Sequence, residues 1–144
     1  MAKILITGGT GLVGSRLTKL LKDKNHEVAI LTRSADAENE YQWDLQKKTI
    51  DKKAFKNTDY IIHLAGAGIA DERWTNERKK VIIDSRVESV NLLFETIKKE
   101  NINLKGFISA SGSGYYGAVT TDKIFTEKDK VGNDFLGEVC EKWE

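Results

Sequence analysis

The sequence contains no proline, one cysteine and few aromatic residues, which make up 8% of its 144 positions. The single cysteine, Cys140, allows no intrachain disulfide and no cysteine-rich zinc site. No apolar run approaches the ~20 residues that span a bilayer, and the first residues carry no secretory cleavage pattern. These absences predict a soluble, cytoplasmic protein whose cysteine stays reduced.

An excess of charge of either sign is also missing. Lys and Arg total 23, Asp and Glu total 22, and the net charge is +1. This balance provides no general attraction to nucleic acid or to an anionic membrane, so neither is expected as a partner. Hydrophobic residues at 40% and charged residues at 31% argue against disorder. The length suits one domain, which we expect to occupy residues 1–144.

Most of the 12 glycines fall in three clusters, at 8–14, 66–68 and 112–117. Each cluster follows a short apolar run, at 3–6, 60–64 and 106–108, and a fourth run at 28–31 ends without glycine. Such runs are typical of strands that are buried on both faces. The pattern therefore predicts strands at all four positions.

Helical patterns lie between these runs. Leucines at 12, 17, 20 and 21 share one helix face, and a stripe at Ile83, Val87, Val90, Phe94 and Ile97 indicates a helix around residues 73–100. Alternating strands and helices predict an α/β fold, a Rossmann-like doubly wound parallel sheet. We expect about five strands in the order 3-2-1-4-5.

The first glycine cluster has the spacing G-x-x-G-x-x-G over Gly8, Gly11 and Gly14, between a predicted strand and a predicted helix. Glycine allows a tight turn, a close approach of the backbone to a pyrophosphate, and close packing of helix on strand. The helix N-terminus then offers free N–H groups to the phosphates. A glycine-rich turn without a ligand is the alternative interpretation. The Gly-Lys-Ser/Thr ending of nucleoside-triphosphatase loops is absent.

The end of the second predicted strand bears on cofactor choice. Dinucleotide folds that prefer NAD place a carboxylate there, about 20 residues after the glycines. This chain has Arg33 and Ser34, with Arg33 standing 19 positions after Gly14. A guanidinium suits a phosphate dianion, so we predict that NADP(H) is preferred over NAD(H). An ordinary exposed arginine is the alternative.

Several motifs resemble those of extended short-chain dehydrogenases/reductases. The more specific ones resemble an atypical branch that is described as NAD(P)-dependent epimerase/dehydratase-like or nucleoside-diphosphate-sugar epimerase proteins. The resemblance covers essentially the whole chain and is carried by segments 7–14, 30–33, 41–44, 64–69, 73–74, 84–86, 109–117 and 143–144. Full-length members are roughly twice as long. Because the last predicted helix, 135–144, ends without a cap, we expect this chain to be the N-terminal Rossmann portion, truncated before a C-terminal substrate-binding region.

The resemblance implies a set of cofactor-binding residues. The pyrophosphate would lie against Gly8, Gly11, Leu12 and Val13, with Gly14 in the same motif. Arg33 and Ser34 would meet the 2′-phosphate, and the pair Asp44 and Leu45 would flank the adenine, with an ordinary turn carboxylate as the alternative interpretation of Asp44. The loop that would pass beneath the cofactor consists of Leu64, Ala65 and Gly66.

Catalysis in the resembled family uses a serine with a Tyr-x-x-x-Lys pair, in which the lysine lowers the pKa of the tyrosine. This sequence has no Tyr-x-x-x-Lys, and the matching positions are Leu136 and Cys140. The candidate catalytic residues that remain are Ser111, Ser113 and Tyr116. A small-residue turn beside the nicotinamide is the alternative interpretation of this segment. No metal site is expected, because His63 and His26 have no partners at metal-ligand spacing.

Three functions stay open at this level. The first is an NADP(H)-dependent oxidoreductase or epimerase-like enzyme that acts on a hydroxyl or carbonyl of an unknown small molecule and is expected to be inactive as this fragment. The second is a non-catalytic NADP(H)-binding, redox-sensing module, and the third is a scaffold with a dead site. Exposed apolar surface on a truncated chain also predicts a homodimer.

Overall fold

One six-stranded sheet organises the fold, and the computed structural model describes all residues 1–144. The strands are β1 (Lys3–Thr7), β2 (Glu27–Thr32), β3 (Glu40–Asp44), β4 (Thr49–Ile50), β5 (Tyr60–His63) and β6 (Gly106–Ser109). The helices are α1 (Leu12–Asp23), α2 (Asn76–Lys99) and α3 (Phe135–Trp143), with 3-10 turns η1 (Lys52–Phe55) and η2 (Ser113–Tyr116). None of the helices, α2 included, has the length and apolar character needed to cross a membrane.

The strand order is β4-β3-β2-β1-β5-β6. Five strands run parallel, in the predicted order 3-2-1-4-5, and β4 adds a two-residue antiparallel strand beside β3. The fold class is therefore confirmed, while β4 was not predicted. The apolar runs also failed to locate β3, because only Trp43 of its five residues is buried.

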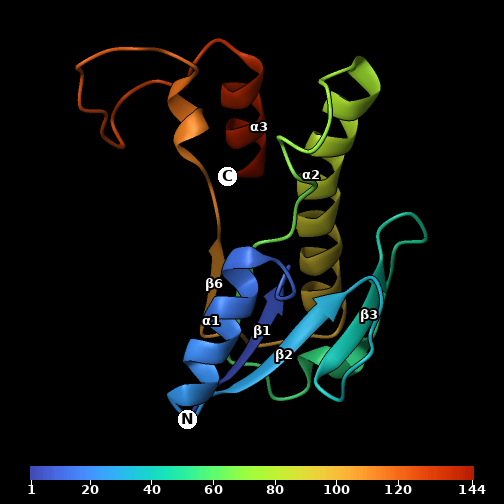
Figure 1. Ribbon diagram of the computed structural model, residues 1–144. Helices are drawn as coiled ribbons and strands as arrows, with labels where there is room; N and C mark the ends of the chain where they lie inside the picture. Colours follow the sequence, from blue (N-terminus) through green and yellow to red (C-terminus); the bar gives the residue numbers. More distant parts are fainter.

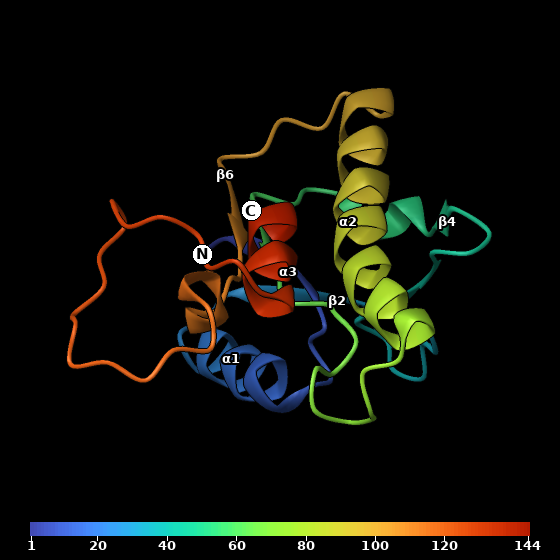
Figure 2. The same ribbon diagram turned by 90° about the horizontal axis from the view of Figure 1, so that it is seen from above.

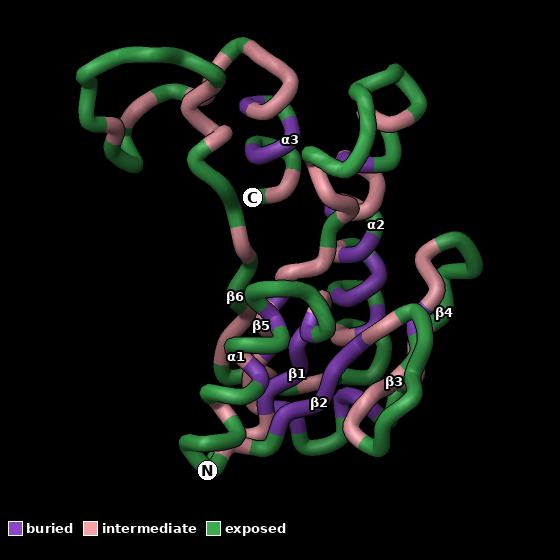
Figure 3. Tube along the Cα trace, viewed as in Figure 1, coloured by how far each residue is buried: buried purple, intermediate pink, exposed green.

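Alternate residues of the central strands feed two cores, one on each face of the sheet. Leu5 of β1 joins a cluster that includes Leu92 and Leu93 of α2. Its neighbours Ile4 and Ile6 join a cluster against which α1 packs. The helices α1 and α2 thus cover opposite faces (Figure 2), and the buried residues concentrate in the strands between them (Figure 3).

The buried stripe of α2 differs from the predicted one by a single position. Its members step by four and three residues, as predicted, but they are Ile82, Arg86, Ser89, Leu93 and Thr96. The predicted stripe is only half-buried, and Phe94 is 51% exposed. Each polar member has a hydrogen-bond partner there: Ser89 meets His63 of β5, and Arg86 donates to the Ala67 carbonyl in the loop after β5. Thr96 donates to the Leu92 carbonyl of its own helix. The helix also begins at Asn76 after the N-cap Thr75, later than expected.

Helix α3 and turn η2 lie beyond the carboxyl ends of the strands (Figure 1). They pack against each other, and α3 also packs against α2. Asp134 caps α3 by accepting a hydrogen bond from the Gly137 amide, at 3.0 Å. The loops that follow β1, β2, β5 and β6 therefore open toward a region that α3 and η2 overhang.

Candidate cofactor-binding site

The parallel register brings the predicted site segments to one edge of the sheet. Thr7 is paired with Leu31 on one side and with His63 on the other, and His63 is paired with Ser109. The segments that begin just after these residues therefore lie side by side. In open α/β sheets, ligands bind in this position, beyond the carboxyl ends of the strands.

Gly8 and Gly14 make a tight cradle where β1 passes into α1. Gly8 has φ +70°, in the left-handed region that favours glycine. A Cβ on Gly14 would lie 2.1 Å from the Gly8 carbonyl oxygen, so helix α1 can pack this closely only without a side chain there. The Gly11 amide closes the turn by donating to the Gly8 carbonyl at 3.1 Å. This geometry fits the close backbone approach that a pyrophosphate requires.

The N-terminus of α1 is open to an anion. Its N-cap is Gly11, which offers no side chain to cap the helix, and the first turn contains no acidic residue. The first amides are therefore left for a ligand, and the helix dipole favours negative charge there. Leu12 and Val13 are 91% and 66% exposed beside these amides. The residues present fit the pyrophosphate of a dinucleotide.

Arg33 and Ser34 lie at the end of β2, the strand next to β1, and both are exposed. The backbone carbonyl of Arg33 accepts a hydrogen bond from the Gln42 side-chain amide at 3.1 Å. Its guanidinium forms none of the ion pairs of the chain. The Glu40 carboxylate accepts from the amides of Asp36 and Ala37, which keeps it within its own loop. Arg33 is therefore an exposed cation without an ionic partner, just after the end of β2.

Asp44 and Leu45 end β3 and begin the turn to β4. Asp44 Oδ1 accepts from the amides of Gln46 and Lys47, at 2.9 and 3.0 Å. The Lys47 bond is the largest cause that holds the pKa of Asp44 below its ordinary value. Leu45 is half-buried against the core beneath α2. Asp44 thus caps a turn in this structure, the role that the sequence left open for it.

Leu64, Ala65 and Gly66 follow β5 and lie against the glycine loop. A Cβ on Gly8 would stand 3.0 Å from the Ala65 nitrogen, so the two loops touch through their backbones. The Thr7 hydroxyl accepts from the Leu64 and Ala65 amides, each at 3.2 Å. The last residue of β1 therefore fixes the start of this loop.

His63 links Thr7 to helix α2. Its Nδ1 lies 2.7 Å from Thr7 Oγ1, and its Nε2 lies 3.2 Å from Ser89 Oγ. The Thr7 hydroxyl oxygen already accepts hydrogen bonds from two amides, so its own hydrogen is donated to Nδ1 of His63. Nε2–H of His63 then donates to the Ser89 hydroxyl, which in turn donates its hydrogen to the Arg86 carbonyl. Burial, aided by the charge of Arg86, lowers the pKa of His63 to about 4. The imidazole is neutral and acts as a structural link.

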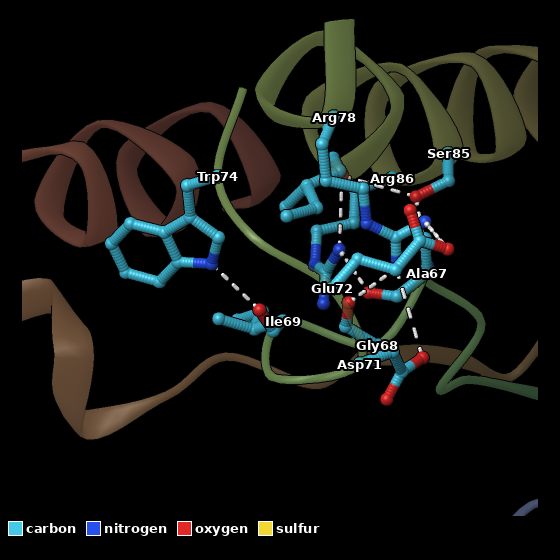
Figure 4. A network of polar contacts seen from close by, with 10 residues as sticks. Ala67, Gly68, Ile69, Asp71, Glu72, Trp74, Arg78, Ser85 and Arg86 are labelled. Carbon is cyan, nitrogen blue, oxygen red and sulfur yellow. Dashed lines mark hydrogen bonds and ion pairs between the residues drawn. The ribbon is translucent and has the colours of Figure 1, made fainter. Parts of the chain in front are cut away.

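Two arginines and a serine of α2 hold the next stretch of this loop (Figure 4). The Ala67 amide donates to Ser85 Oγ at 2.9 Å, and its carbonyl accepts from Arg86 Nη1 at 3.1 Å. Further along, Arg78 Nη2 donates to the Gly68 carbonyl at 2.7 Å. The sequence analysis missed Ser85, Arg86 and the Thr7–His63–Ser89 link. The available signal for Ser85 and Arg86 was segment 84–86, which carried part of the family resemblance.

Trp74 lies in the loop before α2, which begins at Asn76. Its indole Nε1 donates to the Ile69 carbonyl at 2.7 Å. Its ring meets Phe135 of α3 edge-on, with 5.1 Å between centroids. Trp74 is 41% exposed, and its indole joins the loop that follows β5 to helix α3.

The candidate catalytic residues occupy the segment between β6 and the end of η2. Ser111 is exposed, and its hydroxyl donates to the Glu144 carboxylate. Ser113 is exposed and begins η2. The Tyr116 hydroxyl donates to the Thr126 carbonyl at 3.0 Å. The structure therefore brings the two serines to the site edge but directs the tyrosine hydroxyl into the following loop.

The electrostatics of this segment favour neutral groups. Desolvation, followed by the charges of Glu127 and Asp129, raises the pKa of Tyr116. Burial likewise raises the pKa of Cys140, which is 4% exposed and lies 3.6 Å from the Gly112 carbonyl. Neither group is activated for proton transfer at neutral pH. No group of three or more His, Cys, Asp and Glu side chains is arranged to hold a metal ion.

The parallel sheet, the glycine cradle and the open helix terminus together define a nucleotide-binding Rossmann protein. A sequence profile of the NAD dependent epimerase/dehydratase family matches residues 4–135. The chain belongs to this family.

Individual relatives agree with this assignment. An epimerase family protein of Staphylococcus aureus is 36% identical over 100% of this chain and 49% of its own length. The crystal structure of human epimerase family protein SDR39U1 with NADPH superposes with a TM-score of 0.82 at 29% identity, covering 98% of this chain and 47% of the human one. A nucleoside-diphosphate sugar epimerase from Corynebacterium glutamicum gives 0.81 at 34% identity, covering 99% of this chain and 29% of its own. The chain thus spans about half the length of the curated relatives it matches.

Proposed function

We propose that residues 1–144 form the NADP(H)-binding domain of an oxidoreductase or epimerase-like protein that acts on a hydroxyl or carbonyl group. One observation carries this proposal. The uncapped N-terminus of α1 is pressed onto the Gly8 turn, with the unpaired Arg33 guanidinium at the end of the adjacent strand. A dinucleotide that carries both a pyrophosphate and a 2′-phosphate matches these two positive sites. The similarity to a human protein whose structure contains NADPH is consistent with it.

Each predicted cofactor residue then has a part. The amides beside Gly11, Leu12, Val13 and Gly14 bind the pyrophosphate, and Arg33 with Ser34 binds the 2′-phosphate. Asp44 and Leu45 border the adenine from the end of β3. Leu64, Ala65 and Gly66 pass beneath the other half of the cofactor. The nicotinamide supplies the hydride chemistry when the cofactor is bound.

The protein's own share of catalysis is small in this chain. Ser111 and Ser113 would hold a substrate hydroxyl or carbonyl, for which Ser111 would have to release the Glu144 carboxylate. Tyr116 would have to release Thr126 before it could donate its proton. Leu136 and Cys140 supply neither the acid nor the cation of a Tyr-x-x-x-Lys pair. We therefore expect cofactor binding with little or no turnover by this chain alone.

Calorimetric titration of the chain with NADPH and then with NADH tests the cofactor assignment. We expect NADPH to bind more tightly by at least about tenfold, because the 2′-phosphate gains a charge-assisted contact. Arg33→Ala should abolish this preference. Lys24→Ala, which removes an exposed cation just beyond the C-terminal end of α1, is the matched control and should preserve it. Equal binding of both nucleotides by the wild type would refute the NADP(H) preference.

A non-catalytic NADP(H)-binding, redox-sensing role is the second candidate. The Tyr116–Thr126 hydrogen bond favours it, because it occupies the one tyrosine hydroxyl offered for acid–base work. Transfer of hydrogen between labelled NADPH and any carbonyl compound separates the two roles. It is assayed with the full-length protein of which this chain would be the N-terminal half, because the chain alone is expected to show little or no turnover in either role. Hydrogen transfer that is lost in Ser111→Ala would support the enzymatic role. Tight binding of NADPH without hydrogen transfer would support the sensing role. A scaffold with a dead site would bind neither nucleotide.

A further inference from the structure

Arg86 is a buried cation near the centre of helix α2. Arg86 is only 6% exposed, and its Nη1 donates hydrogen bonds to the carbonyls of Ala67 and Ile82, at 3.1 and 2.9 Å. The guanidinium carbon lies 4.7 Å from the centroid of the Trp143 ring. Its Nε is buried without a hydrogen-bond partner. Carbonyl dipoles and an aromatic face are therefore the groups that solvate this charge.

No carboxylate neutralises Arg86. It takes part in none of the ion pairs of the chain. The titratable groups that interact electrostatically with Arg86 are His63 and Cys140. Both are neutral at pH 7, because burial disfavours their charged forms. Desolvation lowers the pKa of Arg86 from its ordinary value, but a guanidinium stays protonated in proteins. A whole positive charge thus persists inside the fold.

This charge lies directly behind the loop that follows β5. A Cβ on Gly66 would stand 2.8 Å from the guanidinium carbon, so the glycine allows the cation to touch the loop backbone. Ser85 and Arg86 together hold the amide and the carbonyl of Ala67. The position of the charge relative to the loop is therefore fixed by three contacts.

The strand order tells which half of a dinucleotide this loop meets. Arg33 follows β2, and the glycine loop follows β1, so the 2′-phosphate end lies on the β2 side of the pyrophosphate. The other half must extend over β5 and β6, on whose side Gly66 and Ser111 lie. This step rests on the proposed function. It places Arg86 behind the nicotinamide half.

We propose that Arg86 makes this site selective for the reduced cofactor, NADPH over NADP+. The oxidised nicotinamide ring carries a positive charge and the reduced ring is neutral. A fixed, unneutralised cation behind the loop repels the oxidised ring and leaves the reduced ring unaffected. Two unit charges about 6–12 Å apart, at an effective dielectric of about 40 near the protein surface, change a dissociation constant by about three- to tenfold.

Arg78 provides a matched control on the same helix. Like Arg86, it donates to a loop carbonyl, that of Gly68. Unlike Arg86, it is accompanied by carboxylates, with Asp71 at 3.7 Å and Glu72 at 3.5 Å. Replacing Arg78 therefore removes a loop contact without removing an unneutralised charge.

The test is the ratio of the dissociation constants of NADP+ and NADPH, measured by calorimetry on the 144-residue chain. We expect Arg86→Met to lower the ratio about three- to tenfold, Arg86→Lys to keep most of it, and Arg78→Met to leave it unchanged even where both affinities fall. A loss of loop order alone would weaken the binding of both nucleotides equally and would leave the ratio of their dissociation constants unchanged.

If Arg86→Met does not fold, Cys140→Asp provides a second test. It places a carboxylate near the intact Arg86 guanidinium and should likewise lower the ratio of the NADP+ and NADPH dissociation constants. An unchanged ratio in whichever of these variants folds overturns the inference. Failure of the wild type to bind either nucleotide would instead refute the proposed function, so the two failures are distinguishable.

Discussion

The hydroxyl of Thr7 lies 2.7 Å from Nδ1 of His63 and joins the final residues of two neighbouring strands, β1 and β5. Through the amides of Leu64 and Ala65 the same hydroxyl fixes the loop that would run beneath the cofactor. Through Ser89 the link reaches helix α2. The core of the sheet and the edge of the candidate site are therefore one hydrogen-bonded unit.

Thr7→Val should destabilise the fold while keeping its shape. The substitution leaves the Ala65 amide and His63 Nδ1 without their partner in a buried place, which costs about 1–3 kcal/mol. Urea unfolding measures this loss. Thr7→Ser, which keeps the hydroxyl, is the matched control and should recover most of it. A valine variant as stable as the wild type would show that the link contributes nothing.

His63 should make the fold sensitive to acid. Its pKa is about 4 in the folded chain and 6.5 in the unfolded chain, so the unfolded state binds more protons between these values. Stability is then fully present above about pH 6.5, falls as the pH drops, and levels off near pH 4, with a total loss of about 3 kcal/mol.

The free energy of unfolding, measured by urea between pH 7 and pH 4, checks this expectation. His63→Gln should flatten the slope in that window. His26→Gln controls for the simple loss of an imidazole. If the wild type and His63→Gln have parallel pH profiles, the burial of His63 has no energetic consequence.

The strand order and the glycine loop could be predicted because both depend on local chemistry. Apolar runs mark strands that are covered on two faces, and the glycines of the first loop have no substitute where Gly14 meets the Gly8 carbonyl. The convergence of Arg33, Leu64 and Ser111 at one edge followed from parallel topology alone. Strand β3 could not be located from apolar runs, because it buries only Trp43.

The polar half of α2 could not be predicted from periodicity. Arg86, Ser89 and Thr96 look like solvent-facing residues in a helical pattern, yet they occupy the buried stripe. The partners of Arg86 and Ser89 are a loop carbonyl and a histidine, 19 and 26 positions away in the sequence. Only the folded chain brings them together, so the displacement of the stripe by one residue was invisible beforehand.

Gly14→Ala should damage both the fold and the cofactor site. A methyl group there would stand 2.1 Å from the Gly8 carbonyl oxygen and 2.7 Å from the Gly9 Cα, so α1 must move away from the loop. We expect a stability loss of about 1–3 kcal/mol and at least about a tenfold loss of NADPH affinity, because the first-turn amides move with the helix. Unfolding and calorimetry measure the two effects.

Gly112→Ala is the matched control for this change. Its new Cβ would meet nothing closer than Cys140 Sγ at 3.8 Å, an ordinary contact. Both stability and NADPH affinity should stay near the wild-type values. Equal behaviour of the two alanine variants would contradict the close approach of α1 to the glycine loop.

Strand β6 should mediate self-association of the chain. It is the last strand of the sheet and pairs only with β5, so one row of its backbone groups is free. Ile108 on this strand is 56% exposed, and Phe94 of α2, stacked beside Phe107, is 51% exposed. A free edge with apolar side chains favours pairing with a second chain.

We expect a concentration-dependent dimer in sedimentation, which Ile108→Lys disrupts by placing a charge on the edge. Ile124→Lys, at a position that is 87% exposed on the long loop after η2, adds the same charge and should leave the dimer intact. A monomer at every concentration, or equal effects of the two lysines, would exclude β6 as the contact.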